Sequence, residues 1–138
     1  MQTVVEKMLN NTYSNNDQKY YIHSSHDTQI WNVLEFLQPL NYDPTDAPYA
    51  STIFFELHYD ETCMSNAKTR GTQCFTVHAL NNGLIIKFDT CLEDNRLNAR
   101  FGSPICTYDA FIKHWNKLRY QAEDVDKKCL TNFIPTAK

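Results

Sequence analysis

Residues 19–37 read KYYIHSSHDTQIWNVLEFL and join a short apolar segment to a helical pattern. The aromatic and β-branched residues at 19–23 are typical of a buried strand. Apolar residues then recur at helical spacing until Pro39, namely Ile30, Val33, Leu34 and Leu37. Side-chain oxygens that could cap this helix come from Ser24, Ser25 and Thr28. A strand that leads directly into a helix predicts an α/β fold.

The sequence after this stretch predicts strands. Residues 51–59 alternate, with Ile53, Phe55, Leu57 and Tyr59 on one face and Phe54, Glu56 and His58 on the other. Residues 73–80 and 84–88 flank Asn81-Asn82-Gly83, where Asn and Gly tolerate the positive φ angles of a tight hairpin. These two segments are expected to pair antiparallel. We assign no role to His58 or His78, which alternate with apolar neighbours on the expected strands.

Helices are expected near both ends. Residues 108–120 have amphipathic spacing, with Thr107 as the cap and a buried set made of Phe111, Ile112, Trp115 and Leu118. Residues 3–9 also have helical spacing, which the polar stretch 10–18 is expected to break. Because this first pattern begins abruptly, we expect that sequence upstream is missing. Trp31 and Trp115 sit at core positions of their helices and are expected to pack inside.

Composition excludes several classes of function. With 138 residues and 42% hydrophobic content, the chain (residues 1–138) has the size of one domain. A net charge of −3 gives no basic face for nucleic acid. No apolar run approaches the roughly 20 residues that span a bilayer. The first ten residues lack the basic and apolar regions of a signal peptide, so none is expected in this chain.

Five cysteines favour an oxidising compartment. They are Cys63, Cys74, Cys91, Cys106 and Cys129, and they include no CxxC step, which argues against a zinc site and for disulfides. The odd count leaves one over, either a free thiol or a cysteine whose partner lies elsewhere. Asn10-Asn11-Thr12 is a glycosylation sequon that would place a glycan on Asn10 and would suit secretion.

The candidate site is Ser25-His26-Asp27-Thr28, at the junction between the expected strand and helix. Anions bind beyond the carboxyl ends of strands, where a helix presents free N–H groups. An imidazole there can donate to a phosphate oxygen, and a carboxylic acid can protonate a leaving alkoxide. A bare His-Asp step also arises by chance, and Asp27 could instead be a helix-capping carboxylate. His23 is expected to be a pocket-wall or core histidine.

The stretch YYIHSSHDTQIWNVLEFL resembles the strand, "HDT" motif and helix of histidine acid phosphatases, branch two of the histidine phosphatase superfamily. Further similar segments follow in the same order, namely APYAS and FEL (residues 47–51 and 55–57), FTVHALNNGLIIKFDTC (75–91) and CTYDAFIKHW (106–115). The likeness covers about residues 18–130, and its specificity comes from that order. It implies the C-terminal part of a histidine-phosphatase-like α/β fold that is incomplete without upstream strands.

The resemblance also implies a function. The family hydrolyses phosphomonoesters through a phosphohistidine, without a metal or cofactor, in secretory, lysosomal or extracellular settings. Its motif would make His26 a phosphate-binding residue and Asp27 the proton donor. Its cysteine pattern favours a disulfide between Cys91 and Cys106 and a bond from Cys129 into the upstream portion. A bridge from Cys63 to Cys74 could close the excursion between two strands.

One family motif is absent. The R-H-G-x-R-x-P sequence that supplies the nucleophilic histidine and two phosphate-clamping arginines does not occur, and none of Arg70, Arg96, Arg100 and Arg119 precedes a histidine. We therefore expect an inactive chain that becomes an acid phosphatase when an N-terminal portion completes it. The apolar faces of Ile53, Phe55, Val77 and Ile86 are expected to lack their full covering. The alternative is a non-catalytic structural or interaction subunit.

Overall fold

The computed structural model describes residues 2–13, 20–41, 47–66, 68, 70–93, 96–98 and 102–118. The architecture is mixed α/β, and the sheets are small and antiparallel. One sheet has the order β1-β2-β3 (Ile53–Tyr59, Phe75–Asn81 and Leu84–Ile85), and β4 (Leu97–Asn98) pairs with β5 (Ser103–Pro104). The helices are α1 (Gln2–Tyr13), α2 (Asp27–Leu37), α3 (Glu61–Ser65) and α4 (Tyr108–Leu118). Within the described ranges, each helix is too short or too polar to cross a bilayer.

The central hairpin forms as the sequence predicted. Its two-residue turn places Asn82 at φ 49° and Gly83 at φ 81°, the left-handed region that such turns require. β3 is shorter than expected because its continuation bonds elsewhere. The backbone N–H of Lys87 donates to the side chain of Asn41, and the carbonyl of Lys87 accepts from Leu40. The segment after α2 therefore takes the place of a longer third strand.

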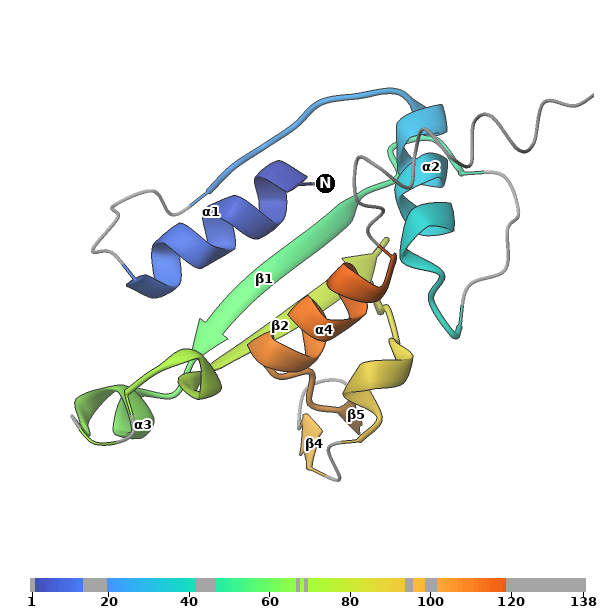
Figure 1. The fold of residues 1–138 in the computed structure, drawn as a ribbon. Coiled ribbons are helices and arrows are strands. Elements are labelled where there is room, and N and C mark those ends of the chain that lie inside the picture. Colours follow the sequence, from blue (N-terminus) through green and yellow to red (C-terminus); the bar gives the residue numbers. More distant parts are fainter. Residues whose placement is uncertain are drawn as a thin grey trace, which may run out of the picture.

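The strand expected at residues 19–23 is the clearest error in the sequence prediction. Residues 20–26 run as an extended connection without secondary structure, drawn as a plain tube leading into α2 in Figure 1. The exposed fractions of Tyr20 and Ile22 are 84% and 89%, so the segment is not buried either. An apolar strand of a parallel sheet needs neighbours on both sides, and the sheets that the described residues form are antiparallel and consist of β1, β2 and β3 and of β4 and β5.

Helix α2 ends before Pro39 as predicted, but the residue at its N-cap differs from the prediction. Its N-cap is His26, whose side chain makes no capping hydrogen bond, so the capping roles expected of the nearby hydroxyls are wrong. At the other end, Gln38 adopts the left-handed conformation and its N–H donates to the carbonyl of Leu34. Pro39 follows and stops the helix.

Helix α1 is longer than predicted and continues through Asn10 to Tyr13. Asn and Thr have low helix propensity, but each costs well under about 1 kcal/mol, far less than a proline. Met8 is 6% exposed and belongs to the buried cluster, so tertiary packing supports this helix. Asn10 of the sequon is exposed on α1.

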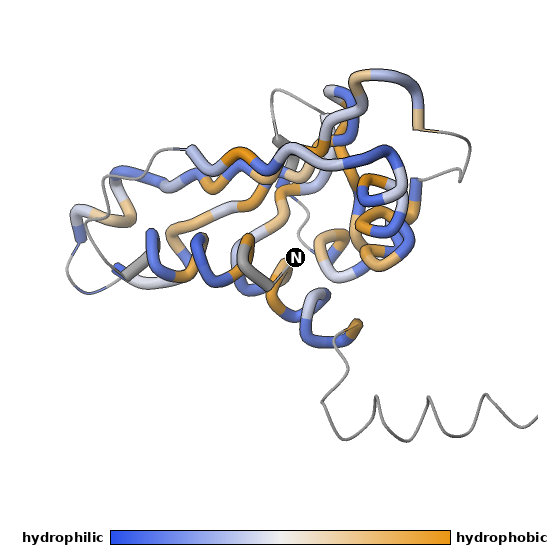
Figure 2. Tube along the Cα trace, turned by 90° about the horizontal axis from the view of Figure 1, so that it is seen from above, coloured by the Kyte–Doolittle hydropathy of each residue, from blue (hydrophilic) through white to orange (hydrophobic). Residues whose placement is uncertain are grey.

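Helix α4 covers the sheet and completes the core. Thr107 caps it as predicted, accepting a hydrogen bond at 3.2 Å from the N–H of Ala110. α4 lies across β2 in Figure 1, and the ring of Phe111 packs between Phe55 and Phe88 at centroid distances of 6.1 and 5.7 Å. Figure 2 shows hydrophobic and hydrophilic residues alternating along the helices, as amphipathic packing requires.

The apolar face of the sheet is better covered than the sequence predicted. Val77 and Ile86 are 1% and 7% exposed, and Ile53 and Phe55 are half-buried, because α4 packs on this face. The prediction that these residues lack covering is therefore wrong for Val77 and Ile86. Large apolar side chains are exposed elsewhere, at Tyr20, Ile22, Trp31, Leu40, Tyr49, Phe54 and Leu84.

Both disulfides that the sequence suggested are present. Cys63 of α3 bonds to Cys74, with their Cα atoms 5.5 Å apart, and closes the connection between β1 and β2. Cys91 bonds to Cys106, with a Cα separation of 4.6 Å, and joins the segment after the hairpin to the start of α4. Cys129 lies outside the described residues. The two bonds are compatible with a secreted protein.

Candidate functional site

The His-Asp pair lies at the N-terminal end of α2. His26 is the N-cap, with φ −86° and ψ 162°, and Asp27 is the first helical residue. Both side chains are exposed. The sequence predicted this position correctly relative to the helix, although the strand that was expected to precede it is absent. An exposed imidazole at the positive end of a helix dipole is suited to hold an anion.

Local hydrogen bonds fix how the two residues are presented. The carbonyl of His26 accepts from the N–H groups of Gln29 and Ile30, at 3.0 and 3.4 Å. Oδ1 of Asp27 accepts from the N–H of Thr28 at 2.7 Å. The carboxylate of Asp27 is thus held in the first turn of α2 by the backbone of the next residue, although the N-cap itself is His26.

Other residues near the motif lie differently from expectation. His23 is exposed, so of the two positions expected for it the core is wrong, and a place in a pocket wall stays a prediction. Trp31, on α2, is 46% exposed, whereas Trp115 on α4 is 6% exposed and packs 5.0 Å from the ring of Phe36. The packing prediction is therefore confirmed for Trp115 and wrong for Trp31, because the face of α2 that carries Trp31 lies outside the core formed by the described residues.

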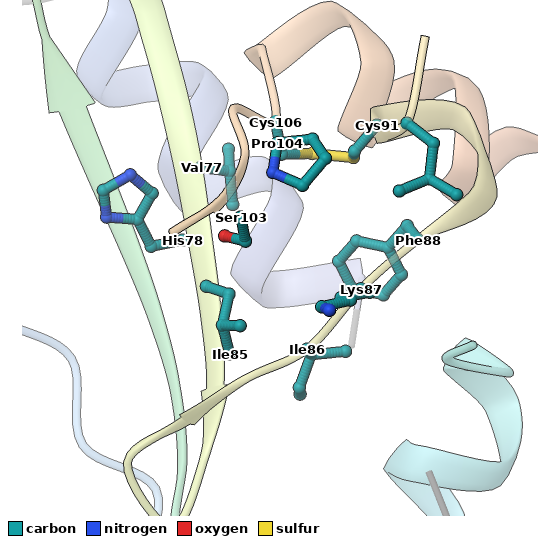
Figure 3. A pocket seen from close by; sticks show the side chains of 11 residues that line it. Val77, His78, Ile85, Ile86, Lys87, Phe88, Cys91, Ser103, Pro104 and Cys106 are labelled. Atoms are coloured by element: carbon teal, nitrogen blue, oxygen red, sulfur yellow. A yellow bond between two sulfur atoms is a disulfide. The ribbon is translucent and has the colours of Figure 1, made fainter. Parts of the chain in front are cut away.

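Two hollows of the structure lie away from His26 and Asp27. Figure 3 shows the first, a cavity of about 20 Å³ beside the Cys91–Cys106 disulfide, with Val77, Phe88 and Ser103 in its lining. That volume holds about one water molecule. The second, of about 80 Å³, lies between the end of α2 and the hairpin. Neither of these two hollows is lined by His26 or Asp27.

A buried histidine ties α2 to α4. Nε2 of His114 lies 2.7 Å from the carbonyl oxygen of Leu37, and Nδ1 lies 2.9 Å from Oδ1 of Asp89. Each ring nitrogen of His114 thus faces an oxygen acceptor, one on the backbone of α2 and one on the side chain of Asp89. Hydrogen bonds from Lys117 and His114 hold the pKa of Asp89 well below its usual range. The network anchors the end of α2 that is remote from His26.

The structure brings together a group that sequence analysis left without a role. Glu56 and His58 of β1 share one face of the sheet with His78 of β2, and their ligand atoms all lie within 4.8 Å of one another. The E-x-H spacing on an alternating strand was a usable signal for the first two residues. His78 could not be added without the register between the strands.

Comparison with protein-family models, with curated proteins and with solved structures found no match. The likeness to histidine acid phosphatases therefore rests on the motifs quoted from the sequence. Among the four arginines, Arg70 and Arg96 are exposed, and Arg100 and Arg119 lie outside the described residues.

Proposed function

We propose that this chain supplies the proton donor and a phosphate-binding imidazole to a phosphomonoesterase that is completed by an N-terminal portion carrying the nucleophile. The observation that carries the proposal is the presentation of His26 and Asp27, side by side and exposed, at the positive end of α2. The order of motifs shared with histidine acid phosphatases supports it.

The chemistry divides between the two portions. A histidine from the N-terminal portion attacks phosphorus, the bond to the ester oxygen breaks, and Asp27 gives its proton to the departing alkoxide. Water then attacks the phosphohistidine, its proton passes to the carboxylate of Asp27, and phosphate leaves. His26 donates a hydrogen bond to a phosphate oxygen in both steps. Because Asp27 must start protonated, the reaction is expected to be fastest in an acidic medium.

The exposed apolar segment supports an incomplete sheet. Residues 20–23 are extended and carry Tyr20, Tyr21 and Ile22, which are 84%, 52% and 89% exposed. An extended apolar segment of this kind can add as a strand to the sheet of the N-terminal portion. That addition would place the start of α2 at the carboxyl end of a parallel strand, where anions bind in α/β folds.

The test is a phosphatase assay on the chain combined with its N-terminal portion, whether both lie on one polypeptide or two. The 138-residue chain alone is expected to be inactive. In the assembly, Asp27→Ala and Asp27→Asn are expected to lower kcat by about 10²- to 10⁴-fold, the usual contribution of a general acid. Asp109→Asn, a carboxylate at the start of α4, is the matched control and is expected to leave kcat unchanged. Turnover by the isolated chain would refute the division of labour.

A second function is favoured by the exposed apolar residues themselves. Tyr20, Ile22 and Trp31 are exposed apolar side chains of the kind that contact other proteins, whether or not catalysis follows. A non-catalytic interaction subunit would keep these side chains and would bind a partner that lacks an R-H-G-x-R-x-P motif. Finding an R-H-G-x-R-x-P motif close to His26 in a bound chain would favour the phosphatase over the interaction subunit.

A further inference from the structure

The β1–β2 pairing gathers three metal-ligating side chains on one face of the sheet. Glu56 stands directly opposite His78 in the antiparallel register, and His58 follows two residues later opposite Thr76. Side chains two residues apart on a strand, and directly opposite across a pair, project on the same side. Seven consecutive residue pairs and the Cys63–Cys74 bond fix this arrangement.

The three ligand atoms lie close enough together for side-chain rotation to bring them onto one ion. Nε2 of His58 lies 3.0 Å and Nδ1 of His78 lies 3.8 Å from the same carboxylate oxygen, Oε2 of Glu56. The two imidazole rings are 4.3 Å apart, centroid to centroid. Bonds of about 2.0–2.2 Å to a tetrahedral zinc ion separate its ligand atoms by roughly 3.4 Å. The three ligand atoms lie within 4.8 Å of one another, so side-chain rotations that shorten the longest separation by up to about 1.4 Å bring all three onto one ion.

The three side chains are buried to different degrees, and an ion bound by them could be reached from solvent. The side chain of His78 is 12% exposed, that of Glu56 33% and that of His58 47%. His78 thus forms the floor and the other two form the rim. Two imidazoles and one carboxylate make a ligand set that zinc accepts, with a fourth position left for water.

We propose that Glu56, His58 and His78 bind one Zn²⁺ ion at the surface of the sheet. This site goes beyond the proposed phosphatase function, because none of its ligands belongs to the His-Asp pair and the phosphatase chemistry needs no metal. The cysteine spacing that argued against zinc does not bear on this cluster, since no cysteine takes part in it.

The test is calorimetric titration of Zn²⁺ into the 138-residue chain with both disulfides formed, in a Cys129→Ser background that removes a competing thiol. One ion per chain is expected. His58→Gln and Glu56→Gln are expected to weaken binding at least about 100-fold, since changes in outer-shell partners alone cost roughly 10- to 100-fold. Both residues are partly exposed, so these variants keep the fold. His23→Gln, an exposed histidine outside the cluster, is the matched control and is expected to bind normally.

A second readout reports the ligands directly. Long-range ¹H–¹⁵N spectra of the imidazoles are expected to show Zn²⁺-dependent shifts for His58 and His78 and none for His23. The proposal is overturned if the wild-type chain binds no zinc, if His58→Gln binds as tightly as wild type, or if His23→Gln loses binding equally. These outcomes do not depend on phosphatase activity, so each proposal can fail without the other.

Discussion

At the residue scale, Asp27 has the most specific role to test. Its carboxylate is held by the N–H of Thr28 at 2.7 Å, so a substitution could act on the helix as well as on catalysis. Leaving groups separate the two effects, because only a poor leaving group needs a proton. Asp27→Asn in the assembly is expected to lose about 10³-fold in kcat on alkyl phosphates and far less on p-nitrophenyl phosphate. Equal losses on both substrates would assign Asp27 a structural role.

Asp89 offers a prediction about pH. Because hydrogen bonds from Lys117 and His114 hold its pKa below the ordinary value of about 3.9, the folded state binds this proton more weakly than the unfolded state. The stabilisation is present above pH about 4 and is lost as pH falls below it. Asp89→Asn is expected to lower the free energy of unfolding at pH 7 by about 1 kcal/mol, after allowance for screening at a 41% exposed side chain.

Urea denaturation at pH 7 and at pH 3 measures this effect. The difference between wild type and Asp89→Asn is expected to shrink at the lower pH, because the Asp89 carboxylate of the unfolded state then takes up a proton while that of the folded state stays ionised. A difference that stays constant between the two values would show that the pKa shift does not stabilise the fold. Glu93→Gln, whose exposed carboxylate contacts Lys113, is the control and is expected to change little.

At the element scale, the hairpin turn depends on one glycine. Gly83 has φ +81°, and a Cβ added there meets no atom within 4 Å, so backbone strain alone opposes a side chain. Gly83→Ala is expected to lower the free energy of unfolding by about 1 kcal/mol. Leu84→Ala, at the neighbouring position with 74% exposure, is expected to change it far less. Urea midpoints compare the two, and equal losses would contradict the strain argument.

The sequence predicted correctly those elements that depend on residues close together in the chain. The periodicities of α2 and α4, the Thr107 cap and the Asn82-Gly83 turn all follow from residues near in sequence. The strand predicted at residues 19–23 was wrong because a strand forms only beside a partner strand. The sequence KYYIH does not reveal whether such a partner is present. The Glu56, His58 and His78 cluster was missed for a related reason. The register of β1 against β2 is set by packing and by a disulfide across a 15-residue connection, neither of which a pattern reveals.

At the scale of the whole molecule, the exposed apolar segment leads to a prediction about assembly. Ile22 is 89% exposed, so its replacement removes no packing from the chain itself. Ile22→Lys is expected to leave the free energy of unfolding unchanged and to weaken binding of the N-terminal portion by 10-fold or more, as desolvation of a lysine in an interface costs over about 1.4 kcal/mol. Leu84→Lys, at a 74% exposed position on the hairpin, is the control. Unaltered binding by Ile22→Lys would exclude strand addition through this segment.

The hydrogen bond from His114 to the carbonyl of Leu37 fixes the C-terminal end of α2. The 11 residues of α2 place His26 about 16 Å from this fixed end, at 1.5 Å per residue. A tilt of about 5° there would carry the imidazole of His26 through roughly 1.4 Å, and displacements near 1 Å can cost 100-fold in rate. The position of the proposed catalytic residues at the N-terminal end of α2 therefore depends on a hydrogen bond at the other end of the helix. That bond is made by His114, which does not contact the phosphate in the proposed mechanism.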